Sequence, residues 1–195
     1  ILYGEKSFSS EVYNHDVANY ILNMQYIEED NNPYVILAPS YFTYSLDFNE
    51  VLNQHISSGA DITCLYTNTN DAKRAYLGCD TLTLDKDKRI IGVDKNRGNA
   101  KSKTVSMETF ILSKELFIKL TKKAAEVSSL YWFKDILKDS VEELDIRGYG
   151  VRGFVGCINS LEEYYRWSME LRDRTVSKGL FNPGWPIYTQ TNDSC

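Results

Sequence analysis

Tyr34-Val-Ile-Leu-Ala38 is a continuous apolar run between a turn at Asn31-Asn32-Pro33 and a loop at Pro39-Ser40. A run of this length and composition is typical of a strand that is buried on both faces of a sheet. Before it, apolar residues recur at helical spacing from Val17 to Ile27 and predict a helix over about residues 12–28. This part of the chain therefore predicts a helix, a buried strand and a loop at the carboxyl end of that strand.

Helices and strands alternate along the rest of the chain. We expect a helix over 47–58, a strand over 61–66, a hairpin of strands 81–84 and 89–93, and a strand over 104–112. Ser113 should cap a helix, another helix should cover 132–141, and two β-rich stretches lie within 145–158. The capping box Ser160-Leu-Glu-Glu163 should open a helix that runs to about residue 173. This order predicts a layered α/β fold.

Composition excludes several classes of protein. The chain has 195 residues, 43% of them hydrophobic, and a net charge of −5. It is too apolar to be disordered, no apolar stretch approaches the ~20 residues of a membrane span, and its mild acidity argues against a dedicated nucleic-acid binder. The four separated cysteines, Cys64, Cys79, Cys157 and Cys195, form no zinc motif and fit a reducing cytoplasm. Because the chain begins Ile1-Leu2-Tyr3-Gly4, we expect it to be part of a longer protein.

Basic residues are concentrated between Asp85 and Lys103, where seven lysines and arginines face three aspartates. This charge would suit a phosphorylated ligand, although a solvated hairpin tip is the simpler interpretation. The chain has no glycine-rich phosphate loop. Its glycine series at 148, 150, 153 and 156 indicates bulges or close backbone approach within strands. The residues by themselves therefore predict an α/β domain without naming its chemistry.

Five segments in register add a resemblance. They are Tyr34–Phe48 with the His55 helix, Ser106-Met107, Lys134-Asp-Ile-Leu137, Ser160–Leu171 and Leu180–Thr189. The first segment resembles Y-V-L-I-L-A-G-D-H-I-Y-K-M-D-Y…H, the second resembles S-M-G, and the third resembles K-D-I-I-P. The fourth resembles T-I-x-x-Y-W-E-A-N-M-D-L, and the fifth resembles the stretch before a C-terminal β-helix. All five patterns are those of the glucose-1-phosphate adenylyltransferase (ADP-glucose pyrophosphorylase) family. The resemblance implies a mixed-sheet nucleotide-diphospho-sugar transferase (Rossmann-like) fold.

The resemblance also implies a division of the chain. Residues 1–179 would form a partial nucleotidyltransferase-like domain, and residues 180–195 would be a linker toward a left-handed β-helix domain. The family's nucleotide loop would lie before Ile1 and its β-helix after Cys195, so both are absent from this chain. Without the strands that precede it in the family, we expect the 34–38 strand to present an open edge that pairs with another copy.

Two departures from the family pattern concern its metal. The family holds magnesium with two aspartates, and in this chain Tyr41 and Cys157 stand at those positions. Magnesium prefers anionic oxygen, whereas tyrosine keeps its proton at neutral pH and a thiol is a soft ligand. The resemblance therefore implies a lost metal site, with no catalytic residue and no cofactor expected in this chain, although active relatives use magnesium.

The sugar-phosphate positions are partly retained. Asp94 and Lys95 stand at the family's E-K-P, and Ser106 is kept from S-M-G. These three residues would form a residual site for a sugar phosphate or an effector. Glu108 replaces the glycine of S-M-G and adds bulk and negative charge where a phosphorylated sugar would approach.

Together these features resemble a regulatory, catalytically degenerate subunit of bacterial glucose-1-phosphate adenylyltransferase. The resemblance implies a cytoplasmic protein that assembles with the catalytic subunit in a hetero-tetramer and modulates ADP-glucose synthesis for glycogen. A sugar phosphate or nucleotide would be its effector, and neither nucleic acid nor a membrane would be a partner. Two alternatives stay open: an active nucleotidyltransferase with displaced metal ligands such as Asp47 or Asp94, and a scaffold module that binds no ligand.

Overall fold

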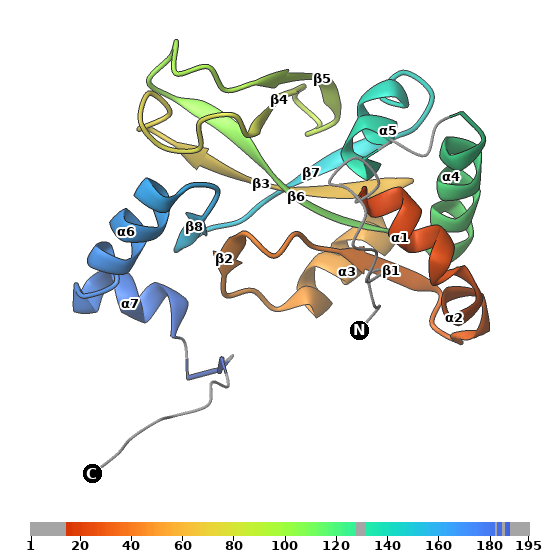
Figure 1. Ribbon diagram of the computed structural model, residues 1–195, viewed down its shortest axis with the longest axis horizontal. Coiled ribbons are helices and arrows are strands. Elements are labelled where there is room, and N and C mark those ends of the chain that lie inside the picture. The colour runs from red at the N-terminus through yellow and green to blue at the C-terminus, as the bar shows by residue number, and fades with distance from the viewer. Residues whose placement is uncertain (1–14, 128–131, 182, 185, 188–195) are drawn as a thin grey trace, which may run out of the picture.

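The computed structural model describes residues 15–127, 132–181, 183–184 and 186–187. A twisted main sheet runs through the middle of the molecule, and a two-stranded sheet lies beside it (Figure 1). The path through the main sheet is β5 (Ile90–Lys95), β4 (Asp80–Leu84), β6 (Lys103–Ser113), β3 (Ile62–Thr69) and β7 (Ile146–Gly150), and β1 (Tyr34–Leu37) also pairs with β6. The smaller sheet pairs β2 (Phe42–Tyr44) with β8 (Val155–Cys157).

The main sheet is mixed. β3 runs parallel to β7, with Ile62 opposite Ile146, and antiparallel to β6. β1 and β4 share one edge of β6: β1 pairs with residues 110–113, and β4 reaches β6 at the pair Thr81–Val105. The stretch of β6 from 106 to 109 therefore lies between these two strands. The observed architecture confirms the expected α/β, mixed-sheet fold.

Helices cover both faces of the main sheet. α1 (Asp16–Leu22), α2 (Met24–Glu29), α4 (Lys114–Val127) and α5 (Phe133–Asp139) lie on one side, where Phe117 and Phe133 pack with Leu112 of β6. On the other side α3 (Phe48–Ser58) and the β2–β8 sheet pack over Leu65, Met107 and Ile111. α6 (Leu161–Glu170) and α7 (Arg174–Leu180) extend this second layer at one end of the molecule (Figure 1).

The helix capping follows the sequence prediction. The Ser113 hydroxyl accepts from the Leu116 amide at 3.2 Å, and the Ser160 hydroxyl accepts from the Glu163 amide at 3.1 Å. The Asp47 carboxylate does the same for Asn49 at 2.8 Å at the start of α3. Such bonds satisfy backbone donors that a helix cannot pair internally.

Three expectations about the elements are corrected. The helix expected over 12–28 is two helices that meet at Asn23, and residues 12–14 lie outside the described residues. The helix expected to reach residue 173 ends at Glu170, and α7 begins at Arg174. The strand at 34–38 is not buried on both faces: Ile36 is 43% exposed, because β6 is the only described strand that pairs with β1.

The glycines of β7 allow close packing, as the sequence indicated. The ring of Tyr66 lies over this strand, so a Cβ at Gly148 would come within 2.8 Å of that ring, and one at Gly150 within 3.0 Å of its hydroxyl. Any larger residue would displace a side chain that belongs to the core.

Candidate functional site

The two positions that hold aspartates in the resembled family meet in the tertiary structure. β2 pairs with β8 so that Phe42 lies opposite Cys157, and the Ile158 amide donates to the Tyr41 carbonyl at 2.7 Å. Tyr41, which directly precedes β2, therefore lies beside the last residue of β8, Cys157, in the segment that follows β1. The sequence predicted that both belong to one site, and the fold brings their backbones together.

Cys157 is completely buried and lies against a second thiol. Its sulfur is 3.5 Å from the sulfur of Cys79, and both cysteines are free. The hydrogen bond with Cys79, together with burial, raises the pKa of Cys157 far above the ordinary value, so the sulfur is a neutral thiol at physiological pH. No sequence pattern indicates this contact, because the two cysteines are 78 residues apart in the chain.

Tyr41 is likewise kept protonated. Burial raises the pKa of its hydroxyl well above the ordinary value, and a hydrogen bond to the neighbouring Glu108 carboxylate raises it further. A protonated phenol beside a carboxylate donates a hydrogen bond, so Tyr41 offers no anionic oxygen to a cation. Within the described residues, no group of three or more histidine, cysteine, aspartate or glutamate side chains could hold a metal ion.

Glu108 projects from a bulge in β6. Cys64 pairs with Phe110 and Tyr66 pairs with Ser106, so residues 107–109 of β6 lie opposite Leu65 alone. Glu108 has φ = 48°, in the left-handed region that costs a side-chain-bearing residue energy and suits glycine. The backbone thus keeps a glycine-type conformation at the position where the resembled family has glycine.

The Glu108 carboxylate forms an ion pair with Lys134 from the first turn of α5. Nζ of Lys134 lies 3.1 Å from Oε1 of Glu108, and the two side chains are only 27% and 12% exposed. Burial alone would lower the pKa of Lys134, but the charge and hydrogen bond of Glu108, with the charges of Asp80 and Asp135, raise it above the ordinary value. Lys134 is therefore a firmly charged ammonium whose charge is already matched within the protein.

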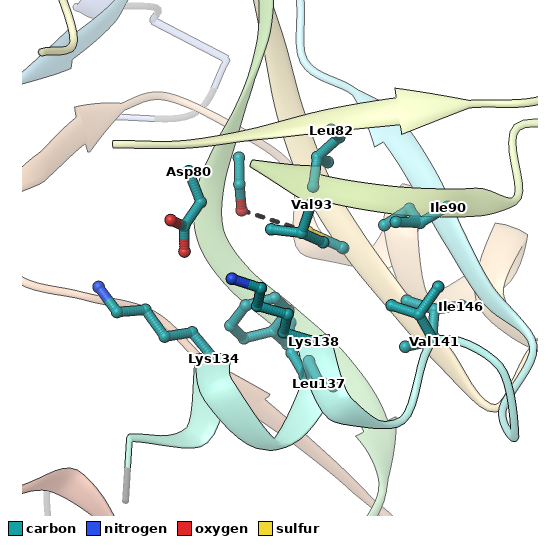
Figure 2. Close-up of a pocket in the computed structure, with 12 residues that line it drawn as sticks. Asp80, Leu82, Ile90, Val93, Lys134, Leu137, Lys138, Val141 and Ile146 are labelled. Carbon is teal, nitrogen blue, oxygen red and sulfur yellow. Dashed lines mark hydrogen bonds between the residues drawn. The ribbon is translucent and has the colours of Figure 1, made fainter. Parts of the chain in front are cut away.

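A small cavity lies behind this ion pair. The Asp80 carboxylate and the ammonium groups of Lys134 and Lys138 gather at one end of it, and aliphatic side chains line the other end (Figure 2). Burial raises the pKa of Asp80, and the charge of Lys134 opposes that shift. The cavity measures about 20 Å³, which is room for one water and far too little for a sugar phosphate.

A larger cleft opens on the other side of Lys134. It has a volume of about 400 Å³ and is lined by the loop from Ala38 to Tyr41, by Glu108 and Lys134, and by Asp16 and Trp132. Asp16 accepts from the Phe133 amide at 3.0 Å, and burial raises the pKa of its carboxyl. This cleft has the size of a small-molecule site and combines an aromatic ring with charged groups.

The three predicted sugar-phosphate residues do not share one cavity. Ser106 is buried, lines the small cavity and accepts from the Glu108 amide at 3.1 Å. Lys95 lies opposite Asp80 in the β4–β5 ladder, and its positive charge opposes the rise in the pKa of the Asp80 carboxyl. Asp94 is exposed on β5, and its carboxylate accepts from the Lys95 amide. Neither Asp94 nor Lys95 lines the small cavity or the cleft.

Sequence reasoning missed several residues of this region. Lys134 belongs to the Lys134-Asp-Ile-Leu137 motif, which assigns it no role, and Asp80, Cys79 and Trp132 stand in no motif. Asp47, the displaced metal ligand considered from sequence, caps α3, where its carboxylate accepts from the Asn49 amide. The sequence signals that point to the site are Tyr41 and Cys157 at the family's aspartate positions and Glu108, which stands in place of glycine after Ser106-Met107.

Comparisons with known proteins identify distant relatives of this chain. A glucose-1-phosphate adenylyltransferase from Saccharophagus degradans is 25% identical over an alignment of 185 positions, gaps included, that covers 86% of this chain and 43% of the relative. One from Shewanella sp. (strain ANA-3) is 25% identical over an alignment of 207 positions, gaps included, that covers 97% of this chain and 49% of the relative. This chain is a distant homologue of glucose-1-phosphate adenylyltransferase. No protein-family model matches it.

This chain spans about half the length of the curated relatives that it matches. Its fold is similar to that of HddC from Yersinia pseudotuberculosis, solved in complex with GMP-PN, with a TM-score of 0.62 at 14% identity over 80% of this chain and 62% of that one. At this identity the likeness concerns the fold alone, a mixed α/β fold. None of the helices in the described part of the chain is long and apolar enough to cross a membrane.

Proposed function

We propose that this chain belongs to a regulatory, catalytically degenerate subunit of glucose-1-phosphate adenylyltransferase. On this proposal it assembles with the catalytic subunit in a cytoplasmic hetero-tetramer and modulates the synthesis of ADP-glucose and pyrophosphate from ATP and glucose 1-phosphate, for glycogen. The observation that carries the proposal is the pairing of β2 with β8, which sets a protonated Tyr41 and a buried thiol, Cys157, at the two aspartate positions.

The residues at these positions do not fit magnesium. Magnesium takes hard oxygen ligands in octahedral geometry, and the site offers a neutral phenol and two thiols that are hydrogen-bonded to each other. An aspartate in place of Cys157 would be an unpaired charge at a position that is fully buried, next to Cys79. The surroundings therefore suit a neutral thiol better than a carboxylate.

Glu108 adds a second obstacle to catalysis. Its carboxylate matches the charge of Lys134, so a phosphate that approached Lys134 would meet a carboxylate already bound there. Binding of a phosphorylated ligand in the cleft would have to break this half-buried ion pair. We propose that a sugar phosphate or a nucleotide acts as an effector in this cleft, beside Lys134, whereas Ser106, Lys95 and Asp94 lie outside the cleft lining.

A steady-state assay of the purified protein tests the proposal. With ATP, glucose 1-phosphate and magnesium, the protein alone should give no ADP-glucose, whereas its addition to the catalytic subunit should change the rate or the effector response of that subunit. Tyr41→Ala and Cys157→Ala should leave the activity of the isolated protein at background. Robust turnover that either substitution abolishes would overturn the degenerate-subunit proposal.

One observation favours the active-enzyme alternative. Two carboxylates, Asp16 and Glu108, line the cleft beside the loop that follows β1. Both are engaged, Asp16 by the amides of Val17 and Phe133 and Glu108 by Lys134. Electron paramagnetic resonance of added Mn²⁺ separates the two functions: tight binding that Asp16→Asn removes would support an active site, and free Mn²⁺ in both proteins would support the regulatory one.

A third reading, the scaffold without a ligand, makes a different prediction. A ligand that binds only the native state raises the melting temperature. Glucose 1-phosphate, ATP and ADP-glucose should each be titrated against thermal unfolding of the protein and of the variant Lys134→Met. A rise that the variant loses supports an effector site in the cleft, and no rise with any of the three supports the scaffold.

A further inference from the structure

Cys79 and Cys157 place two free thiols side by side in the interior of the protein. Their sulfur atoms are 3.5 Å apart, and the two residues are 4% and 0% exposed. A disulfide has a sulfur–sulfur bond of about 2.05 Å, so the two atoms need to approach by about 1.5 Å to form one. The fold has already closed the separation of 78 residues between the two cysteines, which is the entropically costly part of making such a bond.

Hydrogen bonds of the backbone hold both cysteines in place. Cys79 lies directly before β4, where the Asn96 amide donates to its carbonyl at 2.9 Å. Cys157 ends β8, where it lies opposite Phe42 of β2 and its carbonyl accepts from the Trp167 indole at 3.1 Å. The two thiols therefore meet where the main sheet and the β2–β8 sheet adjoin.

The surroundings of the two sulfurs differ and assign them different roles. The side-chain amide of Asn159 donates to the Cys79 sulfur at 3.6 Å, and an N–H group in this position stabilises negative charge that develops on sulfur during reaction. Cys157 has no exposed surface, and its pKa is raised by the hydrogen bond with Cys79 and by burial. Because the thiolate is the reactive form, Cys79 is the thiol that reacts first with an oxidant, and Cys157 is the resolving thiol.

We propose that Cys79 and Cys157 are a redox-sensitive pair that hydrogen peroxide converts into a reversible intramolecular disulfide. The Cys79 sulfur attacks one peroxide oxygen: an S–O bond forms, the O–O bond breaks, and the departing hydroxide takes up the thiol proton as water. The Cys157 sulfur then attacks the sulfenic acid: an S–S bond forms, the S–O bond breaks, and the second thiol proton leaves with the hydroxyl group as water. The two thiols are oxidised and one peroxide is reduced to two waters.

The disulfide would act on the candidate cleft through Tyr41. The Tyr41 carbonyl accepts from the amide of Ile158, which directly follows Cys157, and Tyr41 lines the cleft beside Glu108. Movement of Cys157 toward Cys79 therefore shifts one wall of the cleft, and the new bond ties β8 to the start of β4. The disulfide does not depend on the proposed function, and only its effect on an effector in the cleft rests on that proposal.

Alkylation and peptide mass spectrometry of the purified protein test the inference. The reduced protein is treated with millimolar hydrogen peroxide, and the remaining thiols are blocked with N-ethylmaleimide in denaturant. We expect two of the four cysteines to escape alkylation and one cross-linked peptide pair to contain Cys79 and Cys157. Dithiothreitol should restore all four alkylations by thiol–disulfide exchange. The oxidised protein should melt about 5–10 °C higher than the reduced one, because the cross-link restricts the unfolded chain.

Oxidation of the unfolded protein is the matched control for the geometry. In urea, Cys79 should pair with Cys64, 15 residues away in the chain, about tenfold more often than with Cys157, because the shorter loop closes more readily. Cys64→Ser is the matched variant, since Cys64 is also buried but its sulfur contacts the Ser106 hydroxyl at 3.5 Å, so the native disulfide should be unchanged. Cys157→Ser should stop the reaction at a sulfenic acid on Cys79, which dimedone labels.

Three results would overturn the proposal or a part of it. Alkylation of all four cysteines after peroxide treatment overturns the redox pair. So does a native product that links Cys64 to Cys79 as in urea, because oxidation would then proceed through unfolding. Glucose 1-phosphate is then titrated against thermal unfolding of both redox forms. A rise in melting temperature that differs between the forms supports the action on the cleft, and an equal rise overturns it. A rise in neither form counts against the proposed effector site and leaves the mapped disulfide standing.

Discussion

Replacing Glu108 with glycine and with alanine separates the backbone conformation at this position from its side-chain contacts. Both substitutions remove the ion pair with Lys134 and the hydrogen bond with Tyr41, so these losses cancel when the two variants are compared. What differs is the ability to adopt φ = 48°. Alanine pays the left-handed penalty of about 1–2 kcal/mol, which glycine avoids.

The sign of the difference in free energy of unfolding between Glu108→Gly and Glu108→Ala tests the backbone conformation. At ordinary positions glycine is less stable than alanine by about 0.5–1 kcal/mol, because it loses more backbone entropy on folding. At position 108 the penalty on alanine exceeds that loss, so we expect Glu108→Gly to be more stable than Glu108→Ala by about 1 kcal/mol. For a chain of this size that difference corresponds to about 2–4 °C in melting temperature.

Urea and thermal unfolding of the two variants measure this difference. Lys119, exposed in the middle of α4, is the matched control, where the glycine variant should be the less stable by about 1 kcal/mol. If Glu108→Ala equals or exceeds Glu108→Gly in stability, the left-handed conformation is refuted. In a second measurement, glucose 1-phosphate should raise the melting temperature of Glu108→Gly more than that of the wild type, because Lys134 is released.

Three further predictions follow from individual contacts. Gly148→Ala should lower the free energy of unfolding by about 1–3 kcal/mol, since the new Cβ meets the Tyr66 ring at 2.8 Å. Asp47→Ala should cost about 1 kcal/mol through loss of the α3 cap, as measured by urea unfolding. Burial lowers the pKa of His55 below 6.5, against the opposing charge of Asp61, so the unfolded chain takes up a proton that the native protein does not. Stability should therefore fall as pH drops below 6.5, and His55→Gln should fall less between pH 7.5 and 5.5.

Each of these has a control within the chain. Gly92→Ala should cost less than Gly148→Ala, because its Cβ would lie at an ordinary 3.6 Å from Thr83. Asp47→Ser should keep most of the cap, and equal loss in the serine and alanine variants would contradict the capping role. An unchanged pH dependence in His55→Gln would show that the protonation of His55, which bonds Thr63 at 2.9 Å, is not the cause.

Local patterns in the sequence predicted most of the secondary structure. The hairpin at β4–β5, the caps at Ser113 and Ser160 and the strands of the main sheet follow from spacing within a few residues, where turn chemistry and apolar periodicity act directly. The exposure of β1 could not be read from its composition, because burial depends on which strands lie beside it. The sequence pattern also does not predict the break between α1 and α2 at Asn23, since the apolar period continues across it.

Half of the candidate site was predictable in the same way. Tyr41, Cys157 and Glu108 stood out because motifs fixed their positions in the chain. Asp94, in contrast, is exposed at the edge of the sheet, and Lys134 carries the charge that faces the cleft. Motif positions identify residue types, but a cavity is built by elements that the chain folds together.

The sequence by itself determined the α/β class, the order of the elements and the likeness to glucose-1-phosphate adenylyltransferase, because each of these is written in local periodicity and short motifs. The tertiary structure alone decided that Cys79 lies against Cys157 and that Glu108 adopts a glycine-type backbone and pairs with Lys134. Strand pairing and helix packing join residues that are distant in the chain, and no local pattern encodes such contacts.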